Sequence, residues 1–318
     1  MRISCSWPLH LLLAALLSLH VSSYEVHSIL TARPANATGN LTFGAAITLN
    51  GTSETFLAWG PIIKNTLEMW CWWVNEIKGG IKVGDEVLYP VVKYINDWHS
   101  TDHVANITRH LVEQEGARFL FAPYSTTLTA AAAAVGEELG VVTMAGAASS
   151  TSIYTGKKYL YTPLTSSGEI MTSGIKTLVL RGAESIVTVT QDKTFTNSMC
   201  SPIDDYVAEL AGATGLNASV AGAHALPADP SDADIEALMR NLTARPAPDL
   251  SVGCVYYDVC TRMIAAAKAH GYEPGAMLFS ICVDNSNYLG DVGADDGRYV
   301  LGAVNWHEDM QLAGALTG

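Results

Sequence analysis

Short apolar runs alternate with helix-length amphipathic stretches along most of the chain. The runs are continuously apolar, which is typical of strands that are buried on both faces of a parallel sheet. The predicted strands are residues 41–49, 87–95, 117–122, 140–144, 159–163, 185–190, 219–223, 250–256, 277–283 and 300–304. The predicted helices are residues 56–77, 101–115, 128–139, 167–181, 199–213, 232–242 and 261–270. This alternation predicts an α/β fold of mostly parallel sheets with helices on both faces.

Two successive predicted strands end in loops of small hydroxyl-bearing residues. The strand at 117–122 opens into residues 123–127, and the strand at 140–144 opens into residues 145–151. Both loops should lie at the carboxyl ends of neighbouring strands, the edge at which α/β sheets bind ligands. Small side chains admit a ligand to the backbone, and free N–H groups and hydroxyls can hold a carboxylate. The pattern predicts a small-molecule pocket at this edge.

The amino-terminal residues have the pattern of an export signal. Arg2 precedes a leucine-rich core at residues 9–21, and Val21-Ser22-Ser23 offers small residues for cleavage. We therefore expect a signal peptide at residues 1–23, with a signal anchor as the alternative, and an exposed leader at residues 24–40. Six sequons support export, glycosylation and an extracellular location. They begin at Asn36, Asn40, Asn50, Asn106, Asn217 and Asn241.

Composition narrows the class of protein. The chain has 318 residues, 49% of them hydrophobic and 15% charged, which fits a globular protein. A net charge of −13 disfavours nucleic acid and anionic membrane surfaces as partners. Without Cys5, which would leave with the signal peptide, five cysteines remain, so one thiol has no partner within the chain. Cys254 and Cys282 are the predicted disulfide pair; the alternative is that several cysteines are small buried hydrophobes.

Catalytic signatures are missing from the sequence. It contains no G-x-S-x-G, Walker A, G-x-G-x-x-G or H-E-x-x-H motif. His99 and His103, beside Asp97 and Asp102, have a spacing that could place two metal ligands on one helix face, but a solvated polar turn is the preferred interpretation. We therefore predict that the protein is not an enzyme and that it binds no cofactor and no metal. The alternative, an exported hydrolase, needs a nucleophile such as Ser125 beside a histidine.

Five short motifs, in order, resemble the type I periplasmic binding protein family. This family includes leucine/isoleucine/valine-binding proteins and the extracellular ligand-binding regions of animal receptors. The motifs are Trp73-Val74-Asn75-Glu76-Ile77-Lys78-Gly79-Gly80-Ile81, Asn96-Asp97, Leu120–Thr127, Val141–Ser149 and Asp192-Lys193-Thr194-Phe195. The resemblance extends from about Leu41 to Trp306. It implies a two-lobed clamp that closes on a ligand in the cleft.

The resemblance divides the chain into parts and assigns the ligand-binding residues. We expect lobe I at residues 41–161, a crossover at Thr162-Pro163, lobe II at residues 162–298, and a truncated return toward lobe I at residues 299–318. The implied ligand is an amino acid or a similar small polar metabolite. Lobe I would hold its carboxylate and ammonium, and lobe II would cover it and supply an acidic partner for the ammonium. The implied ligand-binding residues are Ser125, Thr126, Ala147, Ala148, Ser149, Phe195, Tyr256, Tyr257, Asp258 and Asp284.

Several assignments have structural alternatives. Ser125 and Ser149 could be helix N-caps, and the two tyrosines could be ordinary strand aromatics. Phe195 replaces the tyrosine that is usual in the family. The tryptophan-rich helix at 56–77 is interpreted as core, with Pro61 in its first turn; a protein-binding face, such as a homodimer interface through lobe I, is the alternative. A chain ending at Gly318 suggests a receptor fragment, with a membrane or signalling domain beyond its carboxyl terminus, or a truncated gene model.

Overall fold

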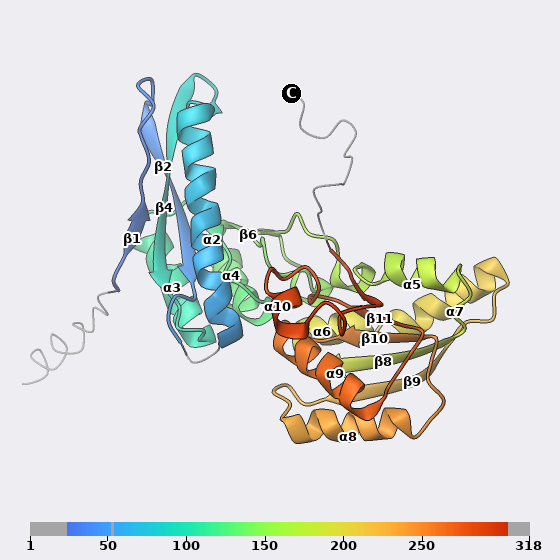
Figure 1. Cartoon of the computed structure of the whole chain (residues 1–318). Coiled ribbons are helices and arrows are strands. Elements are labelled where there is room, and N and C mark those ends of the chain that lie inside the picture. Colours follow the sequence, from blue (N-terminus) through green and yellow to red (C-terminus); the bar gives the residue numbers. More distant parts are fainter. Residues whose placement is uncertain (1–23, 52–53, 305–318) are drawn as a thin grey trace, which may run out of the picture.

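Two mostly parallel sheets form the frame of the molecule (Figure 1). The structure is a computed structural model that describes residues 24–51 and 54–304. The first sheet has the strand order β1-β4-β2-β5-β6-β7, with β3 beside β4. Its strands are β1 (His27–Ile29), β2 (Gly39–Ile47), β3 (Ile81–Val83), β4 (Glu86–Asn96), β5 (Phe119–Phe121), β6 (Val142–Met144) and β7 (Leu160–Tyr161). Its helices are α2 (Glu54–Trp72), continued by a π-helical segment at Trp73–Ile77, α3 (Thr101–Glu113) and α4 (Thr126–Leu139).

The second sheet has the strand order β12-β11-β10-β8-β9 and is parallel at every pairing. Its strands are β8 (Ser185–Gln191), β9 (Ser219–Leu226), β10 (Leu250–Cys254), β11 (Ala276–Phe279) and β12 (Val300–Gly302). Its helices are α5 (Thr172–Val179), α6 (Thr194–Cys200), α7 (Ile203–Thr214), α8 (Asp232–Thr243), α9 (Tyr257–His270) and α10 (Tyr288–Val292). The predicted α/β class with helices on both sheet faces is confirmed.

Side-chain alternation along the strands distributes the core to both faces of each sheet. Along β2, Phe43, Ala45 and Ile47 pack on the side of α2, while Ala46 packs on the side of α3 and α4. In the second sheet, Ile186 faces α5 and α7, while Val189 faces α8 and α9. Both sheets are thus sandwiched between helices, which explains why the strands read as continuous apolar runs.

The ends of the predicted domains differ from expectation. The segment expected as an exposed leader contains β1, which pairs antiparallel with β4 and buries Ile29. The expected return at 299–318 is wrong where the structure describes it, because β12 pairs with β11 in the second sheet. Residues 1–23, the predicted signal peptide, and residues 305–318 lie outside the described residues. Among the described residues, no helix is both long and apolar enough to span a membrane.

Two predicted helices also need correction. Pro61 lies inside α2, since the helix begins seven residues earlier at Glu54. The helix expected at 199–213 is two helices, α6 and α7, that meet at Pro202. Proline removes a backbone donor and clashes with the preceding turn, which explains this break.

The cysteines pair differently from the prediction. The structure contains disulfides between Cys200 and Cys254 and between Cys260 and Cys282, and Cys71 is free and buried. Cys254 packs in the core on the α6 and α7 side of the second sheet, whereas Cys282 packs on the α8 and α9 side. The predicted Cys254–Cys282 pair is therefore wrong, because the two thiols lie on opposite faces of the sheet.

All six sequon asparagines, named above, are exposed. Their positions allow glycans to extend into solvent without disturbing the core. Glycosylation itself stays a prediction.

The close approach of α2 to the end of β2 depends on a glycine. A Cβ atom on Gly60 would lie 1.8 Å from the carbonyl oxygen of Thr48, so α2 would have to move away. We expect Gly60→Ala to lower the free energy of unfolding by about 3 kcal/mol through overpacking. Gly212 in α7 is the matched control, because it is exposed and nothing lies within 4 Å of its added Cβ. Gly212→Ala should stabilise by roughly 0.5–1 kcal/mol in the same urea titration. Equal effects of the two variants would contradict the proposed contact.

Candidate functional site

A cavity of about 250 Å³ lies between the two sheets and is lined from both. Its wall on the side of the first sheet comes from α2 and from the loops after β5 and β6. Its wall on the side of the second sheet comes from α6 and from the segments after β7, β10, β11 and β12. The first wall contains Trp59, Tyr124, Ser125, Thr126, Gly146, Ala147 and Ser149. The second wall contains Leu164, Ile170, Phe195, Tyr256, Tyr257, Ser280, Ile281, Asp284, Asn285 and Ala303.

The amino terminus of α4 provides the polar part of the first wall. Ser125 caps the helix, its side-chain oxygen accepting a hydrogen bond from the backbone N–H of Leu128 at 3.3 Å. Thr126 is 2% exposed, and its hydroxyl has no hydrogen-bond partner among the described residues. A buried hydroxyl without a partner costs free energy, so this hydroxyl is a candidate contact for a ligand. The helix dipole and the free N–H groups favour an anionic group here.

Ser125 also holds a strained backbone. Its φ of 90° and ψ of 150° lie in a region that is essentially restricted to glycine. Such strain persists only where the surroundings determine it, and it clusters at ligand clamps. The loop after β5 is thereby fixed at the cavity.

Aromatic side chains close the cavity from both sides. The ring of Tyr124 stacks on that of Trp59, with centroids 5.1 Å apart and an interplanar angle of 9°. Across the cavity, the rings of Phe195 and Tyr256 lie 6.1 Å apart. Burial raises the pKa of Tyr256 to about 12 and also raises that of Tyr124, so both stay neutral. The wall is suited to an apolar or flat group.

Asp284 is the one acidic residue in the cavity lining, and no lysine or arginine is among these lining residues. The side chain is solvent-accessible, at the loop that follows β11. Desolvation of its carboxylate by the surrounding residues raises the pKa of Asp284 above its ordinary value. The lining is therefore suited to a neutral molecule or to one with a positive group near Asp284.

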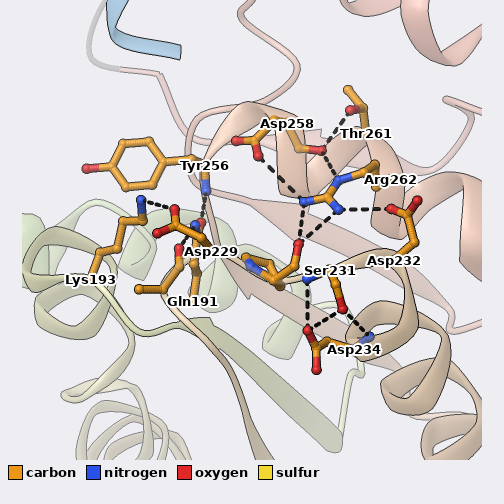
Figure 2. A network of polar contacts seen from close by, with 12 residues as sticks. Gln191, Lys193, Asp229, Ser231, Asp232, Asp234, Tyr256, Asp258, Thr261 and Arg262 are labelled. Atoms are coloured by element: carbon orange, nitrogen blue, oxygen red, sulfur yellow. Dashed lines mark hydrogen bonds and ion pairs between the residues drawn. The ribbon is translucent and has the colours of Figure 1, made fainter. Parts of the chain in front are cut away.

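A hydrogen-bond network positions the wall on the side of the second sheet (Figure 2). Gln191, at the end of β8, accepts a hydrogen bond from the backbone N–H of Tyr256 at 2.9 Å and donates one to the carbonyl of Ala228 at 2.7 Å. Lys193 pairs with Asp229 at 2.8 Å, and its ammonium lies 5.8 Å from the centre of the Tyr256 ring. These contacts hold Tyr256 at the start of α9.

Two of the ten predicted ligand-binding residues lie away from the cavity lining. The carboxylate of Asp258 is 3.6 Å from Arg262, which also bonds to the carbonyl of Pro230 and to Asp232 (Figure 2). Ala148 is buried, and its carbonyl accepts a hydrogen bond from the Tyr154 hydroxyl.

The other eight predicted residues line the cavity. They are Ser125, Thr126, Ala147, Ser149, Phe195, Tyr256, Tyr257 and Asp284. Ser125 is both a cap and a lining residue. The cap alternative fails for Ser149, because the short 3₁₀ helix that follows begins after Ser150. The structure brings these eight residues together around one cavity.

Sequence reasoning missed part of the lining. Trp59 was placed in the core or on a partner-binding face, yet it stacks on Tyr124 at the cavity. Leu164 and Ile281 follow β7 and β11 at the edge where ligands bind, and this position is the signal that could have identified them. Ile170 follows the 3₁₀ helix at Ser167–Glu169 and carried no such signal.

The polar turn after β4 buries Asp97 and leaves Trp98 exposed. Asp97 is 0% exposed, and its carboxylate accepts hydrogen bonds from the Thr48 hydroxyl at 2.6 Å and from the backbone N–H of His99 at 2.8 Å. Burial raises its pKa. The predicted solvated turn is wrong for this residue. His99 has a φ of 56° and precedes α3, so it does not share a helix face with His103, and the described residues contain no metal-ligand cluster.

A second, more open hollow of about 530 Å³ adjoins the cavity. It shares Ser125, Thr126, Phe195 and Tyr256 with the cavity and adds His99 and Lys193. The site thus has an aromatic chamber and a polar approach.

Comparisons with known proteins place the chain in a family. Residues 40–317 match the family model described as periplasmic binding protein. No curated protein sequence matches the chain.

Solved structures share the fold at low identity. One is a substrate-binding protein of an ABC transporter from Aeropyrum pernix, at 16% identity and a TM-score of 0.70, covering 83% of this chain and 65% of that one. Another is the branched-chain amino acid binding protein LivJ from Streptococcus pneumoniae with isoleucine, at 18% identity and a TM-score of 0.61, covering 82% and 70%. A third is a solute-binding protein from Rhodopseudomonas palustris with 3,4-dihydroxybenzoic acid, at 13% identity and a TM-score of 0.60, covering 76% and 61%. The chain thus spans between 61% and 70% of these three structures.

Substitution of Ser125 should separate capping from strain. Ser125→Ala removes the cap and keeps a side chain in the strained conformation, so we expect a loss of about 1 kcal/mol in the free energy of unfolding. Ser125→Gly also removes the hydroxyl but relieves the strain, so its loss should be smaller or absent. Chemical denaturation measures both values. A glycine variant less stable than the alanine variant would contradict the strained geometry.

Proposed function

The chain belongs to the periplasmic binding protein family, and from that premise we propose that it captures an amino acid with an apolar side chain between its two sheets. The family is one of binding proteins, not of enzymes. The proposal depends on two features of one cavity. The buried Thr126 hydroxyl has no hydrogen-bond partner among the described residues, and the aromatic lining contains a single acidic residue.

The proposed pose follows from the charges around the cavity. The ligand carboxylate would lie at the amino terminus of α4, where Thr126 lacks a partner and the helix dipole favours a negative charge. Since no basic side chain is among the lining residues, backbone N–H groups and hydroxyls would hold it, including that of Ser149. The ammonium would lie toward Asp284.

The remaining lining favours an apolar ligand side chain. Leu164, Ile170, Phe195 and Ile281 present apolar surface to the cavity. Two of the similar solved structures contain small ligands, isoleucine in one and 3,4-dihydroxybenzoic acid in the other. A ligand with a second charge would have to lose its hydration among these groups, which is costly without a partner.

We propose that the protein is exported and acts outside the cytoplasm, as a solute-binding protein or as the ligand-binding part of a receptor. The signal-like residues 1–23 and six exposed sequons support export. The two buried disulfides also support export, because disulfides persist in oxidising compartments.

Isothermal titration with an amino-acid panel tests the ligand class. L-leucine, L-isoleucine and L-phenylalanine should bind with dissociation constants on the order of micromolar, while L-glutamate and L-lysine should not bind. The lining has no positive side chain for the second carboxylate of glutamate. It has one acidic side chain, which can pair with only one of the two ammonium groups of lysine. No heat from any neutral amino acid would overturn the proposal.

Asp284→Asn is the control for the pose. It removes the negative charge near the ligand ammonium and should weaken leucine binding roughly tenfold at neutral pH. Because the pKa of Asp284 is raised, the carboxylate becomes protonated at a higher pH than an ordinary aspartate as the pH falls. Leucine affinity should fall through that pH range in the unmodified protein and stay level in the variant. If leucine affinity falls with pH in the variant as it does in the unmodified protein, Asp284 does not contact the ligand.

We also propose that two copies of the chain pair through α2. Large hydrophobic side chains on α2 and the following π-helical segment are exposed at five positions between residues 62 and 77. They are Ile62 (51% exposed), Met69 (63%), Trp72 (46%), Trp73 (46%) and Ile77 (56%). Exposed large apolar side chains gathered on one helix are typical of an interaction surface. Because each copy carries the same exposed side chains, a two-fold axis near Met69 would cover both sets.

Sedimentation velocity tests this pairing. The unmodified protein should be dimeric at micromolar concentration, and Met69→Glu should make it monomeric by burying a charge at the centre of the interface. Leu180→Glu is the matched control, since Leu180 is 55% exposed at the end of α5. A monomeric unmodified protein, or equal effects of the two variants, would exclude pairing through α2.

A further inference from the structure

Among the described residues, no backbone hydrogen bond joins residues 281–287, the turn that carries Asp284, to a strand of the sheet. The Val283 side chain of this turn packs against Gly302 in β12. Strand β11 ends at Phe279, and the last hydrogen bonds to β10 and its continuation come from Ser280, to the carbonyls of Gly253 and Val255. Residues 281–287 follow, and they contribute Ile281, Asp284 and Asn285 to the cavity.

The hydrogen bonds within this turn are local. The backbone N–H of Asn285 donates to the carbonyl of Cys282 at 3.1 Å, and that of Asn287 donates to the Asn285 side chain at 2.9 Å. The backbone N–H of Tyr288 returns to the carbonyl of Asn285 at 3.0 Å. Such bonds give the turn its shape, while its place relative to the sheet depends on the packing of Val283 and on the covalent bond at Cys282.

A disulfide joins this turn to a fixed helix. Cys282 is bonded to Cys260, in the first turn of α9, and both residues are 0% exposed. Helix α9 is itself anchored, because Val259, Met263 and Ile264 are buried in the core on that side of the sheet. The bond therefore transmits the position of α9 to a residue two places before Asp284.

We propose that the Cys260–Cys282 disulfide positions the Asp284 turn at the cavity, so that the acidic part of the binding site depends on this bond. The two cysteines are positioning residues that act through Asp284. The inference rests on the proposed function for its ligand, but the placement of the turn can be tested without any ligand.

The other disulfide provides an internal control. Cys254 lies in β10, which is paired on both sides by β8 and β11, and Tyr256 beyond it is held by Gln191. The position of that segment is therefore fixed without the Cys200–Cys254 bond. The control bond spans 54 residues of sequence against 22, so its loss should cost at least as much global stability.

The experiment compares Cys260→Ala/Cys282→Ala with Cys200→Ala/Cys254→Ala in the full chain. Amide hydrogen exchange of the ligand-free proteins reports the placement of the turn. We expect exchange at residues 281–287 to rise roughly 100-fold in the first variant, with β8 unaffected, and to stay near the unmodified level in the second. A uniform rise across the second sheet in the first variant would show that the bond only stabilises the fold.

Binding of L-leucine provides the second measurement. The first variant should bind leucine roughly tenfold more weakly, and adding Asp284→Asn to it should change the affinity little, because the carboxylate is already misplaced. In the control variant, Asp284→Asn should keep its full effect. Full effects of Asp284→Asn in both backgrounds would overturn the proposal.

Failure of the proposal and failure of the proposed ligand are distinguishable. If the unmodified protein does not bind leucine, the ligand assignment fails, and the exchange measurement alone decides the role of the disulfide. If the alanine pair does not fold, Cys260→Val/Cys282→Ala refills the volume of the sulfur atoms and allows the same comparison.

Discussion

Parallel strand pairing is the constraint on which the rest of the molecule depends. In a parallel sheet, the carboxyl ends of all strands lie at one edge, so the segments that follow them are neighbours in space. The pairing of Leu120 with Thr143 places the loops after β5 and β6 side by side, and the pairing of Gly253 with Phe279 does the same after β10 and β11. The cavity forms where these two edges face each other.

The two walls of the cavity are held in different ways. The first wall begins at a helix cap, where Ser125 combines a hydrogen bond with a backbone conformation that favours glycine. The second wall uses a side-chain amide at Tyr256 and a covalent bond near Asp284. A strained but rigid loop is suited to the constant part of a ligand, since pre-organised groups need not be ordered on binding. A tethered turn can place one charge with little supporting secondary structure.

Local sequence predicted those features that depend on local physics. Apolar runs of strand length revealed the strands, because burial on both sheet faces imposes continuous hydrophobicity. The loops at Ser125 and Ser149 were predicted as pocket loops for the same reason, since a residue just after a strand must lie at the ligand-binding edge. Strand β1 escaped prediction, because three residues at a sheet edge carry too little pattern to stand out from a polar segment.

Features that depend on the direction of a side chain could not be read from the sequence. Asp258 and Asp284 were equal candidates, yet Asp258 lies in the first turn of α9, where Arg262 one turn later attracts it away from the cavity. The cysteine pairing failed on the same ground, because Cys254 in β10 packs on one face of the sheet, while Cys282 in the turn after β11 packs on the other. Trp59 required knowledge of how closely α2 approaches the end of β2, a distance that Gly60 permits and that no periodicity encodes. The positions of Asp284 and of the Trp59–Tyr124 stack at the cavity are therefore determined by tertiary packing. The polar residues at the start of α4 follow from local sequence, because they come directly after a strand.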